Sequence, residues 1–168
     1  MSQLSLSLDS SLLVRDVAGD YRPASAGEVL QAAQRVLAGQ MRGCEVLSSP
    51  QVVRDYLRVK LGALEHEVFA VVHLDSQNRV IEYVEMFRGS VNQTSVYPRE
   101  VVKEALARNS AALLLVHNHP SGSTQPSRAD EMLTQTLKAA LALVDVRVLD
   151  HVIVAGAEVL SMAERGLL

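Results

Sequence analysis

The residues best suited to chemistry lie in one stretch of the chain, which runs from His117 to Asp130. His117 and His119 stand two positions apart at the end of an apolar run, and Asp130 follows across a loop that contains proline and glycine. In a strand, side chains two apart point to the same face, so both imidazoles can reach one ion. Two imidazoles and a carboxylate form a known ligand set for catalytic zinc, which leaves a fourth position for water. The pattern therefore indicates a zinc site with one ion per chain.

The same residues also have a purely structural interpretation. Ser127 and Asp130 have the spacing of a capping box, which begins many helices without any ligand. Two histidines at this spacing are a weak metal signal when they stand alone. The combination favours a bound ligand, because a core strand rarely ends in two imidazoles followed by proline, a glycine loop and an acidic helix start.

Apolar periodicity predicts the elements that must position these residues. We expect helices over 26–39, 50–61, 98–109 and 127–143, and strands over 67–75, 79–88, 111–117, 147–155 and 158–161. The first two strands are expected to form a hairpin at the centre of a sheet. Strands that alternate with helices in this way predict an α/β fold, with a mixed β-sheet flanked by helices.

The N-terminal part of the chain is less regular than the rest. Residues 1–24 show no lasting period, although Leu4, Leu6 and Leu8 alternate in a way that suits a short edge strand. We therefore divide the chain into a short, partly helical N-terminal extension, 1–45, and a metal-binding domain, 46–168.

Composition excludes several classes of protein. The chain has 168 residues and a net charge of −3, from 16 Lys and Arg against 19 Asp and Glu, so strong nucleic-acid binding is not expected. Cys44 is the single cysteine, which excludes an intramolecular disulfide and a multi-cysteine zinc site. The longest apolar runs are too short to span a bilayer, and the N-terminus lacks a secretory signal pattern. These features predict a cytoplasmic protein without a membrane partner.

Four segments resemble the RadC-like branch of the JAMM (MPN+, JAB-domain) metalloprotease superfamily. They are Val96–Glu100, His117–Gly122, Pro126–Asp130 and Leu149–Val154, and the resemblance covers roughly residues 50–168. It implies a cytidine-deaminase-like (MPN/JAB) α/β/α sandwich. It also implies zinc ligation by His117, His119 and Asp130, with Ser127 helping to position or stabilise the oxyanion. The superfamily's catalytic glutamate precedes a short apolar run, and here that match falls on Glu67.

The resemblance implies a zinc-dependent metallohydrolase. Its expected reaction is cleavage of a peptide or isopeptide amide through zinc-bound hydroxide, with Glu67 as proton shuttle and a peptide or protein as substrate. Glu65 is the local alternative to Glu67, because residues two apart along a strand face the same way. Two other functions stay open, a RadC-like protein associated with DNA repair and a catalytically silent interaction module. The sequence also leaves open whether the chain forms a homodimer.

Four further polar residues have mainly structural interpretations. We expect His66 at the surface, His73 in the core or on a sheet face, and His151 in a hydrogen bond within the sheet. Asn118, which stands where the protease branch has Ser or Thr, either orients backbone near the metal or turns the chain.

Overall fold

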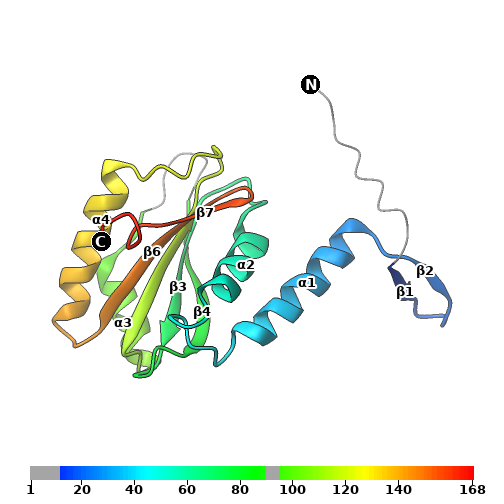
Figure 1. Cartoon of the computed structure of the whole chain (residues 1–168), viewed down its shortest axis with the longest axis horizontal. Coiled ribbons are helices and arrows are strands. Elements are labelled where there is room, and N and C mark those ends of the chain that lie inside the picture. Colours follow the sequence, from blue (N-terminus) through cyan, green and yellow to red (C-terminus); the bar gives the residue numbers. More distant parts are fainter. Residues whose placement is uncertain (1–11, 90–94) are drawn as a thin grey trace.

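The fold is a five-stranded mixed sheet with helices on both faces (Figure 1). The computed structural model describes residues 12–89 and 95–168, so the edge strand considered for residues 4–8 lies outside the described part. Along the chain the elements are β1 (Leu13–Arg15), β2 (Tyr21–Pro23), α1 (Ala26–Met41), α2 (Pro50–Leu61), β3 (Val68–Leu74), β4 (Val80–Arg88), α3 (Pro98–Ala107), β5 (Ala112–Asn118), α4 (Arg128–Ala142), β6 (Arg147–Ala155) and β7 (Glu158–Ser161).

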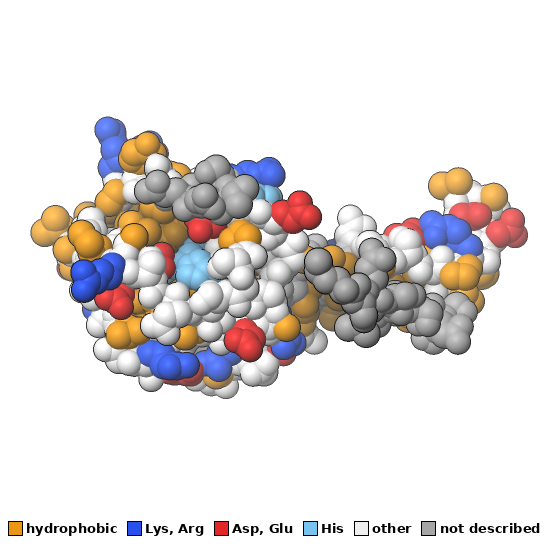
Figure 2. Space-filling model, turned by 90° about the horizontal axis from the view of Figure 1, so that it is seen from above, with side chains coloured by type: hydrophobic (Ala, Val, Ile, Leu, Met, Phe, Trp, Pro, Cys, Tyr) orange, Lys and Arg blue, Asp and Glu red, His pale blue; other side chains and the backbone are white. Residues whose placement is uncertain are grey.

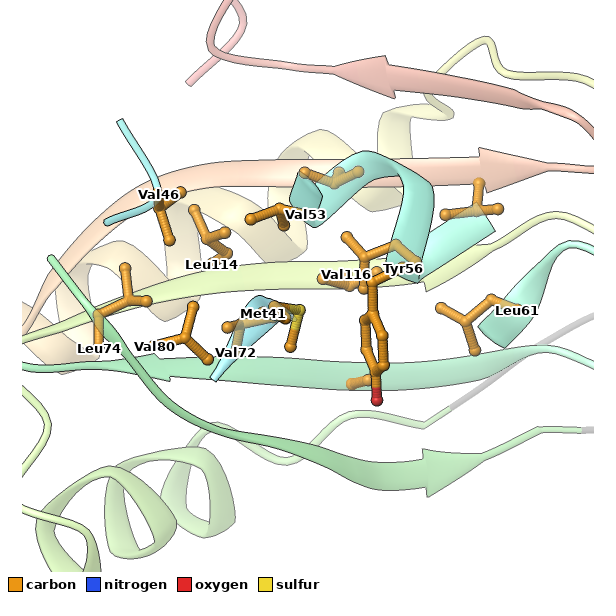
Figure 3. Packing of buried hydrophobic residues seen from close by; sticks show 14 of the residues in the cluster. Met41, Val46, Val53, Tyr56, Leu61, Val72, Leu74, Val80, Leu114 and Val116 are labelled. Carbon is orange, nitrogen blue, oxygen red and sulfur yellow. The ribbon is translucent and has the colours of Figure 1, made fainter. Parts of the chain in front are cut away.

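Two hydrophobic clusters divide the core between the faces of the sheet. One packs α2 against alternate strand residues that include Val72 and Leu114 (Figure 3). The other packs α3 and α4 against the intervening residues of the same strands, which point to the opposite face of the sheet and include Phe69 and Leu115. Each central strand thus buries both of its faces, because successive side chains point in opposite directions. The expected layering of helices, sheet and helices is confirmed.

The strands lie in the order β4-β3-β5-β6-β7. β5 and β6 are parallel and are joined through α4, whereas the other neighbouring pairs are antiparallel. The hairpin of β3 and β4 is present, but the expectation of two central strands is wrong, because β4 is an edge strand. Its charged side chains, Glu82, Glu85 and Arg88, suit an edge that neighbouring chains must not extend.

The N-terminal extension is more ordered than the sequence suggests. β1 and β2 form a small antiparallel hairpin, so the expectation of no regular structure over residues 1–24 is wrong for this part. Its turn is closed by Asp16, whose Oδ1 accepts hydrogen bonds from the amides of Ala18 and Asp20, and by Gly19, which has φ +97°. A three-residue strand has too little periodicity for the sequence to reveal it.

Helix α1 leads from this hairpin to the body of the domain (Figure 1). Ser25 and Glu28 form a capping box at its start. Near its end Met41 is buried in the cluster under α2, and the Gln34 side chain donates a hydrogen bond to the carbonyl of Val59. Among the described residues, no helix is long and apolar enough to cross a membrane.

Candidate metal centre

The topology brings the end of β5 and the start of α4 to one place. His117 is the second-last residue of β5, and His119 directly follows the strand. Because α4 forms the crossover between the parallel strands β5 and β6, its N-terminus lies beside the carboxyl end of β5. Asp130 stands in the first turn of α4, so its carboxylate meets the two imidazoles.

The three side chains converge on one another. The Nε2 atoms of His117 and His119 are 2.9 Å apart. Asp130 Oδ1 lies 3.3 Å from Nε2 of His117, and Asp130 Oδ2 lies 3.5 Å from Nε2 of His119. One ligand atom from each residue falls within 4.8 Å of the others, which is compatible with a single bound ion.

Electrostatics couple the three groups. Burial alone would raise the pKa of Asp130, but hydrogen bonding with His117 and His119 holds that pKa far below its usual range. The pKa of His119 is raised, mainly by its hydrogen bond with Asp130. The carboxylate is therefore charged at neutral pH and attracts a cation to this place.

A chain of hydrogen bonds defines which nitrogen of His117 carries a proton. The Thr134 hydroxyl donates to the carbonyl of Asp130 over 2.6 Å, so its oxygen accepts the bond from Nδ1 of His151, also 2.6 Å long. Burial lowers the pKa of His151 well below its usual value, so the ring is neutral and its Nε2 is an acceptor. His117 Nδ1, 2.8 Å away, must then donate to it.

Both histidines consequently direct Nε2 inward, and in each neutral ring this nitrogen carries the lone pair. His119 Nδ1 donates to the carbonyl of Ser123 over 2.6 Å, which leaves its Nε2 unprotonated in the neutral ring. Two imidazole nitrogens and a carboxylate thus face one point, where either ring protons that donate to Asp130 or a cation in their place can satisfy all three. This donor set fits a divalent metal ion of the kind that takes mixed nitrogen and oxygen ligands.

Ser127 forms the helix cap expected from the sequence. Its backbone amide and its Oγ each donate to Asp130 Oδ2 over 2.7 Å, and Asp130 N donates back to Ser127 Oγ over 3.1 Å. The structural and functional interpretations of these residues are therefore compatible, because the cap itself holds the carboxylate toward the histidines.

A pocket of about 510 Å³ opens beside the three side chains. Its lining residues are Glu67, Val96, His119, Ser121, Ser123, Gln125, Ser127, Ala129, Asp130 and Leu133. In this described lining there is no lysine or arginine. Figure 2 shows pale blue histidine atoms at the surface of the molecule, with white and orange atoms around them and red Asp or Glu side chains beside them. Among the described residues, the pocket therefore offers polar and acidic groups and one histidine, but no lysine or arginine.

The structure distinguishes between the two candidate glutamates. Glu67 precedes β3, lines the pocket and contributes to raising the pKa of His119. Glu65 is exposed and is not among the lining residues. The structure therefore brings Glu67 to His119, Asp130 and Ser127, and leaves Glu65 outside.

The other histidines lie near their expected places, with one addition. His73 is completely buried and hydrogen-bonds Ser110 through Nδ1, and half-buried His66 contacts Arg88. His151 is also buried, but its partners are His117 and Thr134, so its bond orients a candidate ligand. Sequence reasoning missed this role, since it depends on the register between β5 and β6.

Comparison with known proteins agrees with this geometry. Residues 47–167 match the RadC-like JAB domain. A UPF0758 protein of Leptothrix cholodnii is 63% identical over 140 residues, which are 83% of this chain and 63% of that protein. UPF0758 proteins of Methylibium petroleiphilum and Verminephrobacter eiseniae are 56% and 61% identical over 167 and 150 residues, which cover 95% and 89% of this chain and 75% and 63% of theirs. The chain thus spans less than two thirds of two of these relatives. It belongs to the RadC-like JAB domain family.

Proposed function

We propose that this domain is a zinc-dependent hydrolase that cleaves an amide, in a peptide or an isopeptide bond. The observation that carries the proposal is the convergence of two imidazole nitrogens and a carboxylate on one point, with Glu67 in the lining of the adjoining pocket. Zinc is the ion favoured here, because His, His and carboxylate are a ligand set of catalytic zinc sites.

Each residue would have a separate part in the reaction. His117, His119 and Asp130 would hold the zinc, which when bound lowers the pKa of water and polarises a carbonyl. Glu67 would take a proton from the attacking water and return it to the leaving amine. Ser127 keeps Asp130 in place, and its hydroxyl borders the pocket where a carbonyl oxygen could accept a hydrogen bond.

The lining of the pocket supports an uncharged substrate group. Sites that bind nucleic-acid phosphates commonly use lysine and arginine beside neutral donors, which add to the charge of any bound metal ion. The described lining supplies serine and glutamine side chains, two carboxylates and a histidine, but neither lysine nor arginine. This favours an amide over a phosphodiester, and it favours a peptide or protein over DNA as partner.

Hydrolysis can be tested with zinc-loaded protein. Isopeptide-linked and linear peptide libraries would be incubated with the wild type and with Glu67→Gln, and products identified by mass spectrometry. We expect zinc-dependent cleavage by the wild type and a loss of about 10²–10⁴-fold in rate for Glu67→Gln, because glutamine cannot accept the proton. Glu65→Gln is the matched control and should cleave like the wild type, since Glu65 lies outside the pocket.

Other outcomes would favour the alternatives. Zinc-dependent cleavage of DNA, with peptides left intact, would replace the amide hydrolase with a DNA-associated enzyme. Zinc binding without any cleavage, with Glu67→Gln indistinguishable from the wild type, would favour a silent interaction module.

A further inference from the structure

We propose that Asn118 is a positioning residue that holds Glu67 toward the metal centre. It would do so by tying the backbone on both sides of Glu67 to the strand that carries the histidines. The inference rests on the proposed role of Glu67 as proton shuttle, but the contacts that suggest it belong to Asn118 itself.

The Asn118 side chain makes two hydrogen bonds, one buried and one partly buried. Its Oδ1 accepts from the amide of Val68 over 2.7 Å, and its Nδ2 donates to the carbonyl of His66 over 3.0 Å. The side chain is almost entirely buried, with the residue 2% exposed. A flipped amide would set donor against donor and acceptor against acceptor, so only this orientation satisfies both bonds.

These two bonds continue the connection between the two strands beyond the end of their backbone ladder. The described register between β3 and β5 ends at Phe69 and His117. Beyond it, the Asn118 side chain bonds the backbone of Val68 and His66. On the other side of the chain, the amide of Gly89 donates to the carbonyl of Glu67 over 2.9 Å. The backbone around Glu67 is thus hydrogen-bonded on two sides. Asn118 bonds the residues before and after Glu67, and Gly89 bonds the carbonyl of Glu67 itself.

The backbone of Asn118 is itself fixed to the strand of the ligands. Asn118 pairs with Val154 of β6, and the amide of His119 donates to the Val154 carbonyl over 2.8 Å. One residue therefore joins two parts of the site, its backbone lying between the two histidines and its side chain lying beside Glu67. The separation between the glutamate and the metal ligands then depends on this neutral amide.

Asn118→Ala tests the inference, with Val116→Ala as the matched control. Both variants remove buried atoms from β5, but Val116 makes packing contacts only, on the α2 face. In Asn118→Ala we expect the Val68 amide to exchange about tenfold faster than in Val116→Ala, as for the loss of one hydrogen bond. Zinc content should remain near that of the wild type, because the three ligands are untouched.

A second readout reports the position of Glu67 without any substrate. With Co²⁺ in place of zinc, paramagnetic relaxation of the Glu67 side-chain protons measures their distance from the ion. We expect this relaxation to weaken in Asn118→Ala and to stay unchanged in Val116→Ala. Asn118→Asp keeps the acceptor for Val68 but loses the donor to His66, so it should preserve protection at Val68 and remain informative where the alanine variant does not fold.

Two results would overturn the inference. One is unchanged Val68 exchange and unchanged Glu67 relaxation in Asn118→Ala. The other is loss of zinc as complete as in His117→Ala, which would place Asn118 in the metal site itself. Neither readout needs turnover, so this test remains valid if the protein proves not to be a hydrolase. In the same way, the hydrolase test remains valid if Asn118 proves not to position Glu67.

Discussion

Nε2 of His151 lies 2.8 Å from Nδ1 of His117, which joins a ring on β6 to a candidate ligand on β5. His151 is completely buried, packs edge-on against Phe69 and is held on its other side by Thr134 of α4. The bond fixes both the tautomer and the plane of the His117 ring. Partners of this kind raise the basicity of a ligating histidine and hold it in the orientation that the metal needs.

His151→Ala should therefore weaken metal binding without removing a ligand. We expect zinc affinity to fall about 10–100-fold, the usual effect of losing a partner that orients a ligand. Competition with a chromogenic chelator would measure it. His151→Gln, which keeps an acceptor for His117 Nδ1, should lose less. His66→Ala is the control, because His66 lies outside the ligand set, and equal affinity in His151→Ala and His66→Ala would contradict the role of His151.

The ligands themselves should control metal content. Purified protein should bind about one zinc ion per chain, and His117→Ala, His119→Ala and Asp130→Asn should each lower that content greatly. Elemental analysis of the dialysed proteins would measure it. Asp130→Asn keeps an oxygen that can accept the helix-capping bonds, so its loss of zinc would reflect charge and not unfolding. Glu131→Gln, in the same helical turn, is the matched control, and full occupancy in all three ligand variants would rule out the site.

Much of this site could be predicted because its signals are local. His117 lies in β5 and His119 follows two residues later, just past the end of the strand, and Ser127 and Asp130 follow the local pattern of a helix cap. The long apolar periods of β5 and α4 predict the elements that carry them. A local pattern therefore indicates which side chains can meet, provided that the strand and the helix are adjacent.

The parts that could not be predicted depend on pairing between distant segments. The bond from His117 to His151 requires the parallel register of β5 and β6, including its shift between Leu113 and Leu114. The edge position of β4 depends on how the later strands pair. β5 adds to the free side of β3 and not to β4, and the sequence of these strands does not indicate that choice. The two hydrogen bonds from the Asn118 side chain to the backbone around Glu67 depend on the point where β3 and β5 stop pairing.

Ser127→Ala should affect both the helix and the metal centre. Loss of the cap is expected to reduce the free energy of unfolding by about 1 kcal/mol, measured by chemical denaturation. Zinc affinity should fall as well, because Asp130 Oδ2 loses the hydroxyl that orients it. Ser121→Ala is the control, since Ser121 lines the same pocket outside the cap. Unchanged stability and zinc affinity in Ser127→Ala would contradict this account.

Deletion of residues 1–24 should leave a folded domain that binds metal. The cut preserves Ser25 and Glu28, which cap α1, and it removes only the β1–β2 hairpin from the described elements. The deletion also removes the ion pair between Arg22 and Glu28, but exposed pairs contribute little. Thermal unfolding and zinc content would be compared with the full chain, and an insoluble or metal-free product would contradict the prediction.

Stability at mildly acidic pH should depend on His73. Burial lowers the pKa of His73 to about 4, with Arg108 lowering it further and Glu104 and Glu82 opposing this. In the unfolded chain the pKa of a histidine is about 6.5, so between these values the unfolded state binds the extra proton. Stability contributed by neutral His73 is therefore complete above pH 6.5 and is lost as the pH falls toward 4.

His73→Gln removes this titration and tests the prediction. Glutamine can keep a hydrogen bond to Ser110, the partner of His73 Nδ1, but it does not ionise. We expect the wild type to lose up to about 3 kcal/mol more than the variant between pH 6.5 and 4, from the size of the pKa shift. Denaturant titrations of both proteins across this range would measure the difference. His151 is buried in both proteins, so its own contribution cancels in the comparison. Parallel stability curves would show that His73 does not control the acid response.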